Sequence, residues 1–283
     1  MRMHIMTDLE GVAGVCQWEN RDDTGPANAL RRQRLSRLLA GEVNAAIEGL
    51  LAAGFDEVIV NDGHGSGSTI DYDIADPRAL YYHGRERPFW LPFLSDRCAA
   101  TGAVGAHSRA STPSGCLAHT MSGAIRRWTI NDLEVGETGL QALIAGYHGV
   151  PFIFAAGDIW LCREMEETVP GCVTVPMKYG TSKHSAMALP PQRACELIRE
   201  GAERAMEAID CVEPLALESP VLWRDERVDP TWDEEEDQPE GITIVNAHVR
   251  EIVGEDLMDV IQKVYPNYDY DFAPEEWTPG VRT

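Results

Sequence analysis

Two acidic residues near the start of the chain, Asp8 and Glu10, follow a short apolar run and precede Gly11 and Gly14. This pattern predicts a buried strand that stops abruptly. Because side chains alternate between the two faces of a strand, we expect both carboxylates to point the same way. Carboxylates held side by side in an apolar environment repel each other, and a divalent cation bound between them relieves that repulsion. One interpretation is therefore a metal site, and the alternative is a strand-end turn with solvated acids.

Two histidines occupy similar positions in the pattern. His64 follows an apolar stretch at residues 56–61, and His107 directly follows another at residues 102–106. Glu137 lies at the start of a helical pattern. A single histidine after a strand is more often a hydrogen-bonded loop residue than a metal ligand, so the shared placement carries more weight than any one residue. Sites in open α/β sheets gather beyond the carboxyl ends of the strands, and we expect these side chains to meet there.

Together these positions supply three carboxylates and two imidazoles, namely Asp8, Glu10, His64, His107 and Glu137. That set suits two zinc ions (Zn²⁺) with one bridging carboxylate. Two divalent cations with three carboxylates leave a net positive site, which can activate a water molecule. Paired metal ions lie about 3.5–4 Å apart and clamp a tetrahedral intermediate. The residue types therefore predict a binuclear zinc centre with hydrolytic chemistry.

The segments around these residues alternate between strand and helix. Apolar residues recur at helical spacing over residues 30–53, and Gly54 provides a C-terminal stop. Strand, helix and strand in this order form a βαβ unit, whose two strands are parallel. Further strands are expected at residues 124–131, 151–155, 173–177 and 242–249, a turn at 132–136, and helices at 137–148, 159–168, 190–209 and 253–264.

We therefore expect an α/β fold in which a mostly parallel sheet is flanked by helices, with a smaller C-terminal α+β portion. Residues 1–211 form the metal-binding α/β catalytic domain in this prediction, and residues 212–283 form the smaller portion. The acidic run at residues 232–240 is typical of a solvated linker. Residues 76–100 have no clear period and contain many aromatic side chains, so they are expected to cover part of the sheet.

The composition limits the partners of the chain. Of its 283 residues, 24 are basic and 46 acidic, which gives a formal charge of −22. Such a negative field repels phosphate backbones, so we expect no nucleic-acid partner. We find no apolar run of membrane-spanning length and no signal-peptide pattern, so no membrane association is expected. Seven cysteines without a C-x-x-C pair suit a reducing cytoplasm better than a disulfide framework.

Four blocks of sequence carry a resemblance to a known family: TDLEG from residue 7, VNDGH from residue 60, GAHSRASTPSGCLAHTMSG from residue 105 and INDLEVGETGL from residue 130. The spaced combination of all four is specific. The sequence resembles the D-aminopeptidase family (DppA-like zinc aminopeptidases) from its start to about residue 210. The resemblance implies two zinc ions per subunit, with Asp8 bridging them. It further implies that Glu10 and His107 complete the coordination of one ion, and that His64 and Glu137 complete the coordination of the other.

The resemblance also implies a catalytic role for His119, which matches the family's catalytic histidine, described as a nucleophile. A neutral imidazole also suits general acid–base catalysis, so both roles stay open. Family members assemble as pentamer-based decamers that enclose their sites, and the same homo-oligomer is implied here. The implied function is a zinc-dependent hydrolase of peptide or amide bonds, an aminopeptidase that releases N-terminal amino acids, including D-amino acids, from small peptides.

The chain departs from the family in two ways. Met6 stands where the family's motif usually has a serine, which removes a candidate partner of the zinc ligands. The 76–100 segment, with Arg85, Arg87 and Arg97, and the acidic tail are poorly matched, and they can reshape the pocket. Two alternatives therefore stay open: an amidase that acts on a small non-peptide amide, and a non-catalytic, metal-stabilised oligomeric binding protein.

Several further polar residues have more than one interpretation. Asp62 and Asp158 are either partners of the zinc ligands or ordinary strand-end caps. Lys178 either polarises a substrate carbonyl or lies on the surface. Cys116 is either a small buried residue or a reactive thiol or additional metal ligand. Arg109 is expected to hold the loop in which it lies.

Overall fold

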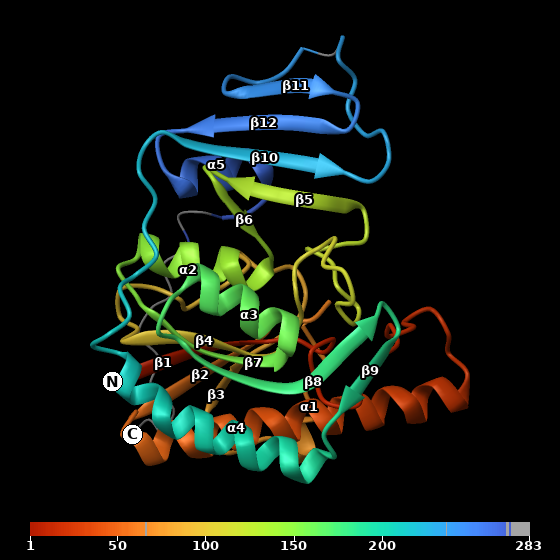
Figure 1. Ribbon diagram of the computed structural model, residues 1–283, viewed down its shortest axis with the longest axis vertical. Helices are drawn as coiled ribbons and strands as arrows, with labels where there is room; N and C mark the ends of the chain where they lie inside the picture. The colour runs from red at the N-terminus through yellow and green to blue at the C-terminus, as the bar shows by residue number, and fades with distance from the viewer. Residues whose placement is uncertain (66, 236, 270–271, 273–283) are drawn as a thin grey trace, which may run out of the picture.

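The computed structural model describes residues 1–65, 67–235, 237–269 and 272. Its central sheet has seven strands in the order β3-β2-β1-β4-β7-β8-β9, and all neighbours are parallel except β8 and β9. The strands are β1 (Arg2–Thr7), β2 (Glu57–Asp62), β3 (Leu80–Tyr82), β4 (Ala100–Ala106), β7 (Phe152–Asp158), β8 (Val173–Ser182) and β9 (Ser185–Ala188). This mostly parallel sheet confirms the predicted α/β class (Figure 1).

Helices cover both faces of the sheet (Figure 1). On one face α1 (Pro26–Ala53) and α4 (Pro191–Ala205) pack against each other, and on the other face lie α2 (Glu137–Tyr147) and α3 (Ile159–Thr168). Two short 3-10 turns, η1 (Tyr72–Ile74) and η2 (Met206–Ala208), contact α1 and α4 respectively. Because both faces are covered, every residue of β4 and β7 is buried, as is typical of parallel sheets.

The first helix, α1, shows how the sequence sets its own limits. It begins at Pro26, four residues before the predicted start, since a proline in the first turn lacks only an N–H that would have no helical partner. It ends as predicted at Gly54, which adopts a φ of 110° and donates its N–H to the carbonyls of Leu50 and Leu51. One stripe of the helix faces the core, at Leu35, Leu39, Val43, Ile47 and Leu50.

A second sheet has five antiparallel strands in the order β11-β12-β10-β5-β6. Its strands are β5 (Ile125–Ile130), β6 (Leu133–Val135), β10 (Val221–Arg227), β11 (Ile242–Asn246) and β12 (Val249–Gly254), and α5 (Leu257–Val264) packs against β10 and β12. Two buried tryptophans, Trp128 and Trp223, meet edge to face with ring centroids 4.7 Å apart. This sheet and α5 form the smaller α+β portion.

Some predicted boundaries in this portion were wrong. The expected turn at residues 132–136 contains β6, because Asn131 takes a left-handed φ of 50° and closes a hairpin between β5 and β6. The expected strand at residues 242–249 is two strands, β11 and β12, and the helix expected from residue 253 starts at Leu257 because Val253 pairs with Leu222. The second sheet combines strands from both sides of the predicted 211/212 boundary, which itself stays a prediction.

The register of the parallel strands brings three chain segments to one edge of the large sheet. Thr7, the last residue of β1, pairs with Asp62 at the end of β2 and with Val104 near the end of β4. Since the strands run in the same direction, the loops that carry Asp8 and the two histidines leave the sheet together. The predicted site residues therefore start from neighbouring positions.

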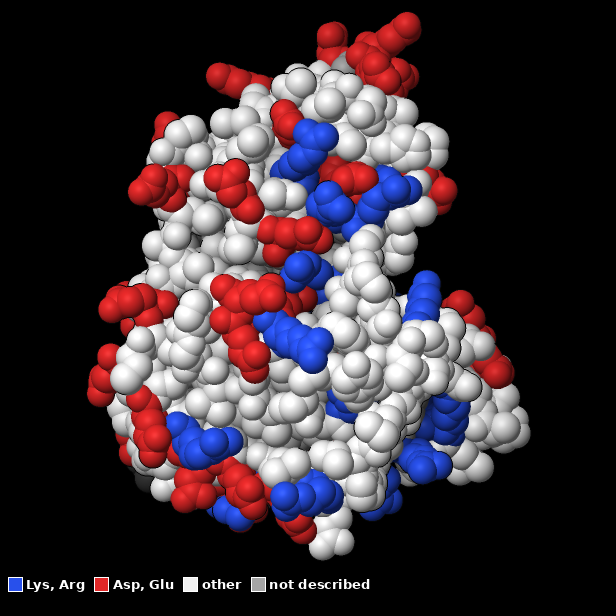
Figure 2. All heavy atoms as spheres, viewed as in Figure 1, with Lys and Arg blue, Asp and Glu red and all other residues white. Residues whose placement is uncertain are grey.

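Among the described residues, no helix combines the length and the apolar character needed to cross a membrane. Aspartate and glutamate are spread over the face seen in Figure 2, with lysine and arginine between them. Local positive charge is therefore notable wherever it gathers without acidic partners.

Candidate metal centre

The loop after β1 carries the first two predicted ligands. The sequence pattern led us to expect Asp8 and Glu10 on the strand, but β1 ends at Thr7 and the two acids lie in a tight turn. Both carboxylates nevertheless face one partner: Asp8 Oδ1 and Glu10 Oε2 each lie 2.9 Å from His64 Nδ1. The turn, rather than strand alternation, brings the two acids together.

This turn lies directly against the end of β4. The Gly11 N–H donates to the carbonyl of Gly105 at 2.6 Å. A Cβ on Gly11 would lie 1.8 Å from the carbonyl oxygen of Ala106, so no side chain fits there. The glycine that follows the two acids in sequence therefore permits the close approach that positions them.

Asp8 occupies the middle of the cluster. Its Oδ1 faces His64, and its Oδ2 lies 3.1 Å from Nε2 of His107. On the far side of that histidine, Glu137 Oε1 lies 3.4 Å from the same Nε2. Asp8, Glu10, His64 and His107 are each at most 6% exposed. The fold thus brings all five predicted ligands into one cluster.

The contacts divide this cluster into two groups, each with ligand atoms within 4.8 Å of one another. One contains Asp8, Glu10 and His64, and the other contains His107, His119 and Glu137. This grouping by distance differs from the expected pairing of Glu10 with His107 and of His64 with Glu137. The strand order explains the difference, because β1 lies between β2 and β4, so Asp8 separates the two histidines.

The residues present fit a pair of divalent cations. His107 Nδ1 lies 2.9 Å from the carbonyl oxygen of Ser108, which can only accept, so Nδ1 carries the proton of the neutral ring. Its Nε2 then presents a lone pair to the carboxylates of Asp8 and Glu137. Among the described residues, His107 Nε2 and Glu10 Oε2 are both buried and make no hydrogen bond of normal geometry, although they lie 3.1 Å from Asp8 Oδ2 and 2.9 Å from His64 Nδ1, respectively. Nitrogen and oxygen lone pairs that converge in this way are the donor set of a zinc site.

The charges in the cluster interact strongly. Burial alone would lower the pKa of His64 and His107, yet the adjoining carboxylates raise both well above their usual value. Burial would raise the pKa of Asp8, yet the two histidines hold it well below its usual value. Burial and the charge of Asp8 raise the pKa of Glu10 to about 7. This concentration of negative charge calls for positive partners, which bound cations supply.

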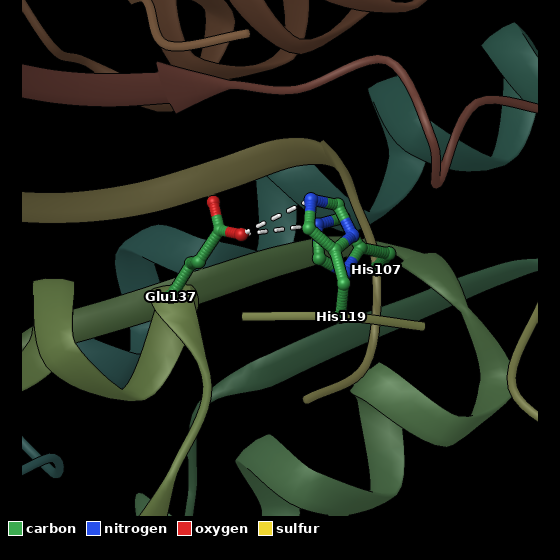
Figure 3. Close-up of side chains that lie close together, drawn as sticks. All are labelled: His107, His119 and Glu137. Atoms are coloured by element: carbon green, nitrogen blue, oxygen red, sulfur yellow. Dashed lines mark ion pairs between the residues drawn. The ribbon is translucent and has the colours of Figure 1, made fainter. Parts of the chain in front are cut away.

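His119 is the third member of the second group (Figure 3). Its ring stacks on that of His107 with centroids 4.0 Å apart, and it lies nearly perpendicular to the ring of Trp18 with centroids 5.1 Å apart. Its Nδ1 donates to the carbonyl of Leu117 at 3.0 Å, which leaves Nε2 free, 3.6 Å from Glu137 Oε1. Burial and the neighbouring His107 lower the pKa of His119, which favours the neutral ring. A free Nε2 at this position can accept a proton or attack a carbonyl carbon.

Glu164, in the middle of α3, joins the two loops of the second group. Its buried carboxylate accepts the N–H of Arg109 at 2.9 Å and the N–H of Gly136 at 3.1 Å. The first lies two residues after His107, and the second directly precedes Glu137. Arg109 thus holds its loop as expected, although mainly through its backbone. Nothing in the helical pattern around Glu164 marks this role, because it depends on contacts across the fold.

Glu19 supports His64 from behind. Its Oε2 lies 3.3 Å from His64 Nε2, and its carboxylate also pairs with Arg21 at 2.6 Å and Arg32 at 2.7 Å. A carboxylate behind a metal-binding histidine fixes the orientation of the ring. The sequence places Glu19 in a polar loop and gives no sign of this contact.

The position of Lys178 fits neither of the two roles considered for it, polarising a substrate carbonyl or lying on the surface. It is only 3% exposed, so it does not lie on the surface. Its Nζ donates to the backbone carbonyls of Glu10 and Val15, the latter at 2.7 Å, and not into the site. The ammonium group therefore holds the turn that carries the first two ligands.

The other residues left open behave as structural groups. Asp62 accepts the backbone N–H of Thr69 at 2.6 Å, and Asp158 caps α3 through the N–H of Trp160 at 2.9 Å. Cys116 is buried, and burial raises the pKa of its thiol to about 12. The two acids are caps and the thiol is a small buried group.

A cavity of about 820 Å³ opens onto the cluster. Asp8, Glu10, His64, His119 and Glu137 line its inner part. The cavity is large enough for a small peptide, and it brings the ligand cluster and the free nitrogen of His119 to the same space.

Three comparisons with known proteins agree on one family. The family profile described as D-aminopeptidase matches residues 1–264. The chain is 34% identical over 225 residues to a D-aminopeptidase from Bacillus subtilis (strain 168), covering 78% of this chain and 80% of that protein. The solved structure of the Zn-dependent D-aminopeptidase DppA from Bacillus subtilis, described as a self-compartmentalizing protease, matches with a TM-score of 0.85 and 28% identity. That match covers 94% of this chain and 96% of the other.

Proposed function

The chain belongs to the D-aminopeptidase family, and from this membership we propose that it is a zinc-dependent aminopeptidase with two zinc ions per subunit. The reaction is hydrolysis of the amide bond next to a free amine, with D-amino acids as N-terminal residues. The family resemblance found in the sequence is confirmed, and so is the class of enzyme, a zinc-dependent peptide hydrolase.

The single observation behind the binuclear centre is the position of Asp8. Its two carboxylate oxygens face different histidines, His64 at 2.9 Å and His107 at 3.1 Å, as a bridging ligand requires. In this proposal Asp8, Glu10 and His64 hold one ion, and Asp8, His107 and Glu137 hold the other. Zinc at these positions supplies Lewis-acid chemistry, because it polarises a carbonyl oxygen and makes a water molecule acidic enough to react near neutral pH.

The side chains around the centre perform the remaining tasks. Nε2 of His119 takes up or delivers the proton at the scissile amide, or attacks its carbonyl carbon, and Leu117 keeps the ring in the tautomer that leaves this nitrogen free. Trp18 packs against the same ring, nearly perpendicular to it, and limits its rotation. His119 is therefore the proposed catalytic residue.

We further propose that the chain forms a pentamer-based homodecamer in the cytoplasm. The support is the description of the similar Bacillus subtilis structure as self-compartmentalizing, together with seven cysteines that are all free. Light scattering tests the assembly, with an expected mass of about ten times the 31.3 kDa chain.

The function is tested with p-nitroanilides and dipeptides that carry D- or L-alanine, and with a small non-peptide amide. We expect zinc-dependent release of the D-amino acid, loss of activity with a chelator and recovery when zinc is returned. Asp8→Asn should abolish turnover, whereas Asp96→Asn, at an exposed loop position, should not. Activity that survives complete metal removal would contradict the proposal, and turnover of only the non-peptide amide would favour the amidase alternative.

A further inference from the structure

A second cavity, of about 720 Å³, adjoins the one that opens onto the metal centre. The two share four lining residues: Arg21, Gly65, Arg85 and Tyr268. Two of these four are arginines, and neither aspartate nor glutamate is among them. Although acidic residues line other parts of both cavities, among them Glu19 and Glu86, this junction places two guanidinium groups beside the proposed site.

The guanidinium of Arg85 lies at this junction, where it lines both cavities. It forms no hydrogen bond or ion pair with any other residue that the structure describes, and it is exposed. A guanidinium offers donors in a planar fork that matches a carboxylate. Within the part of the chain that the structure describes, no group competes with a ligand in the cavity for the Arg85 guanidinium.

The loop that carries Arg85 is anchored to the loop that carries His64. The Gly84 N–H donates to the carbonyl of Gly67 at 2.5 Å. On the other side of Arg85, the Arg87 side chain donates to Asn61 Oδ1 at 2.9 Å and to the carbonyl of Gly84 at 3.1 Å. Arg87 is thus occupied with backbone and side-chain acceptors, and its contacts hold Arg85 at a defined position relative to the metal centre.

Arg21 completes the junction from the loop between β1 and α1. Its Nη2 lies 3.0 Å from His64 Nε2, and its Nε donates to Glu19 at 2.6 Å. A Cβ on Gly65 would lie 1.7 Å from Nη2 of Arg21, so the guanidinium lies flat against a backbone without a side chain. Arg21 is partly neutralised by Glu19, which leaves Arg85 as the principal anion-binding group.

We propose that this junction is a carboxylate subsite, and that the preferred substrates are short peptides with a free C-terminal carboxylate held by Arg85 while the first amide bond lies at the metal centre. This inference rests on the proposed function and names the substrate class of the same site. An acidic side chain presents the same chemistry as a C-terminal carboxylate, and the test separates the two sources.

The test compares three substrates: D-alanylglycine, its C-terminal amide, and the α-amide of D-alanylglutamic acid. For the unmodified enzyme we expect kcat/KM for the free acid to exceed that for the amide about tenfold or more, because a charge-assisted pair is lost in the amide. Arg85→Gln should bring the ratio of the two kcat/KM values close to one. It should do so by raising KM for the acid, with kcat changed less than twofold. Arg34→Gln, an exposed arginine on α1 outside both cavities, is the matched control and should preserve the ratio.

If kcat/KM for the α-amide of D-alanylglutamic acid also exceeds that for the amide of D-alanylglycine, the subsite accepts a side-chain carboxylate as well as a C-terminal one. Equal kcat/KM for acid and amide, or a ratio unchanged by Arg85→Gln, would overturn the subsite. If no compound is turned over, the proposed function fails. Calorimetric binding of the acid and the amide to the zinc-loaded protein then tests the carboxylate subsite separately. Equal affinities would overturn the subsite, and tighter, Arg85-dependent binding of the acid would support it.

Discussion

His4 lies in the middle of β1 and is fully buried, and burial lowers its pKa to about 4. An unfolded histidine has a pKa of about 6.5. Between these values the unfolded chain binds a proton that the folded chain does not, so stability falls as the pH drops from about 6.5 toward 4. We expect the unfolding free energy to be about 2 kcal/mol lower at pH 5 than at pH 7.5 because of His4 alone.

His4→Gln should reduce this acid sensitivity, measured by urea unfolding at both pH values. His83→Gln, at an exposed histidine, is the control and should keep the pH dependence of the unmodified chain. If His4→Gln loses as much stability on acidification as the unmodified chain, the burial argument is wrong for this residue.

Glu164 supports the loops of the candidate metal centre mainly through backbone N–H groups, together with an ion pair at 3.7 Å to the Arg109 side chain. Replacing it with glutamine leaves one acceptor oxygen where two N–H groups, of Arg109 and Gly136, now converge. We expect Glu164→Gln to weaken zinc binding about tenfold, the lower end of the range for residues that orient metal ligands. Chelator competition measures this, with Glu167→Gln, exposed on the same helix, as the control. Equal zinc affinity in both variants would show that Glu164 serves packing alone.

At the scale of elements, the sequence patterns reveal what depends on neighbours in the chain. The helix at 159–168 is found at its predicted bounds, because period and capping are local properties. The strand character of Val253 was missed, because it depends on pairing with Leu222, far away in sequence. The meeting of the five predicted ligand residues could be foreseen, since each follows a recognisable strand or opens a helix. The roles of Glu19 and Glu164 were not, since their contacts exist only in the folded chain.

The turn between β1 and α1 is the element most dependent on a single side chain. The buried ammonium of Lys178 donates to carbonyls of this turn, at Glu10 and Val15. Lys178→Met would leave these carbonyls without a donor, so we expect a loss of about 3 kcal/mol of unfolding free energy. Denaturant unfolding measures it, and Lys183→Met, at the exposed turn between β8 and β9, is the control. A variant as stable as the unmodified chain would mean that water replaces the ammonium.

At the scale of the whole molecule, the proposed centre couples metal binding to folding. Its ligands come from the ends of β1, β2 and β4 and from the start of α2, segments up to 129 residues apart that meet only in the native state. A ligand that binds only the folded state stabilises it by about 2.7 kcal/mol when its concentration is a hundred times its dissociation constant. For a chain of this size we expect removal of zinc to lower Tm by at least about 5 °C.

The effect of zinc on Tm also distinguishes the metal ligands from the proposed catalytic residue, His119. Asp8 faces both histidines, so Asp8→Asn should abolish the zinc-dependent rise in Tm. His119 lies close enough to His107 and Glu137 to be a ligand by distance alone, yet its ring stacks on His107 and its Nε2 lies 3.6 Å from Glu137 Oε1. His119→Gln should therefore keep the full zinc-dependent rise while losing turnover. If His119→Gln loses the rise as Asp8→Asn does, His119 is a metal ligand, and a different group must handle the proton of the scissile amide.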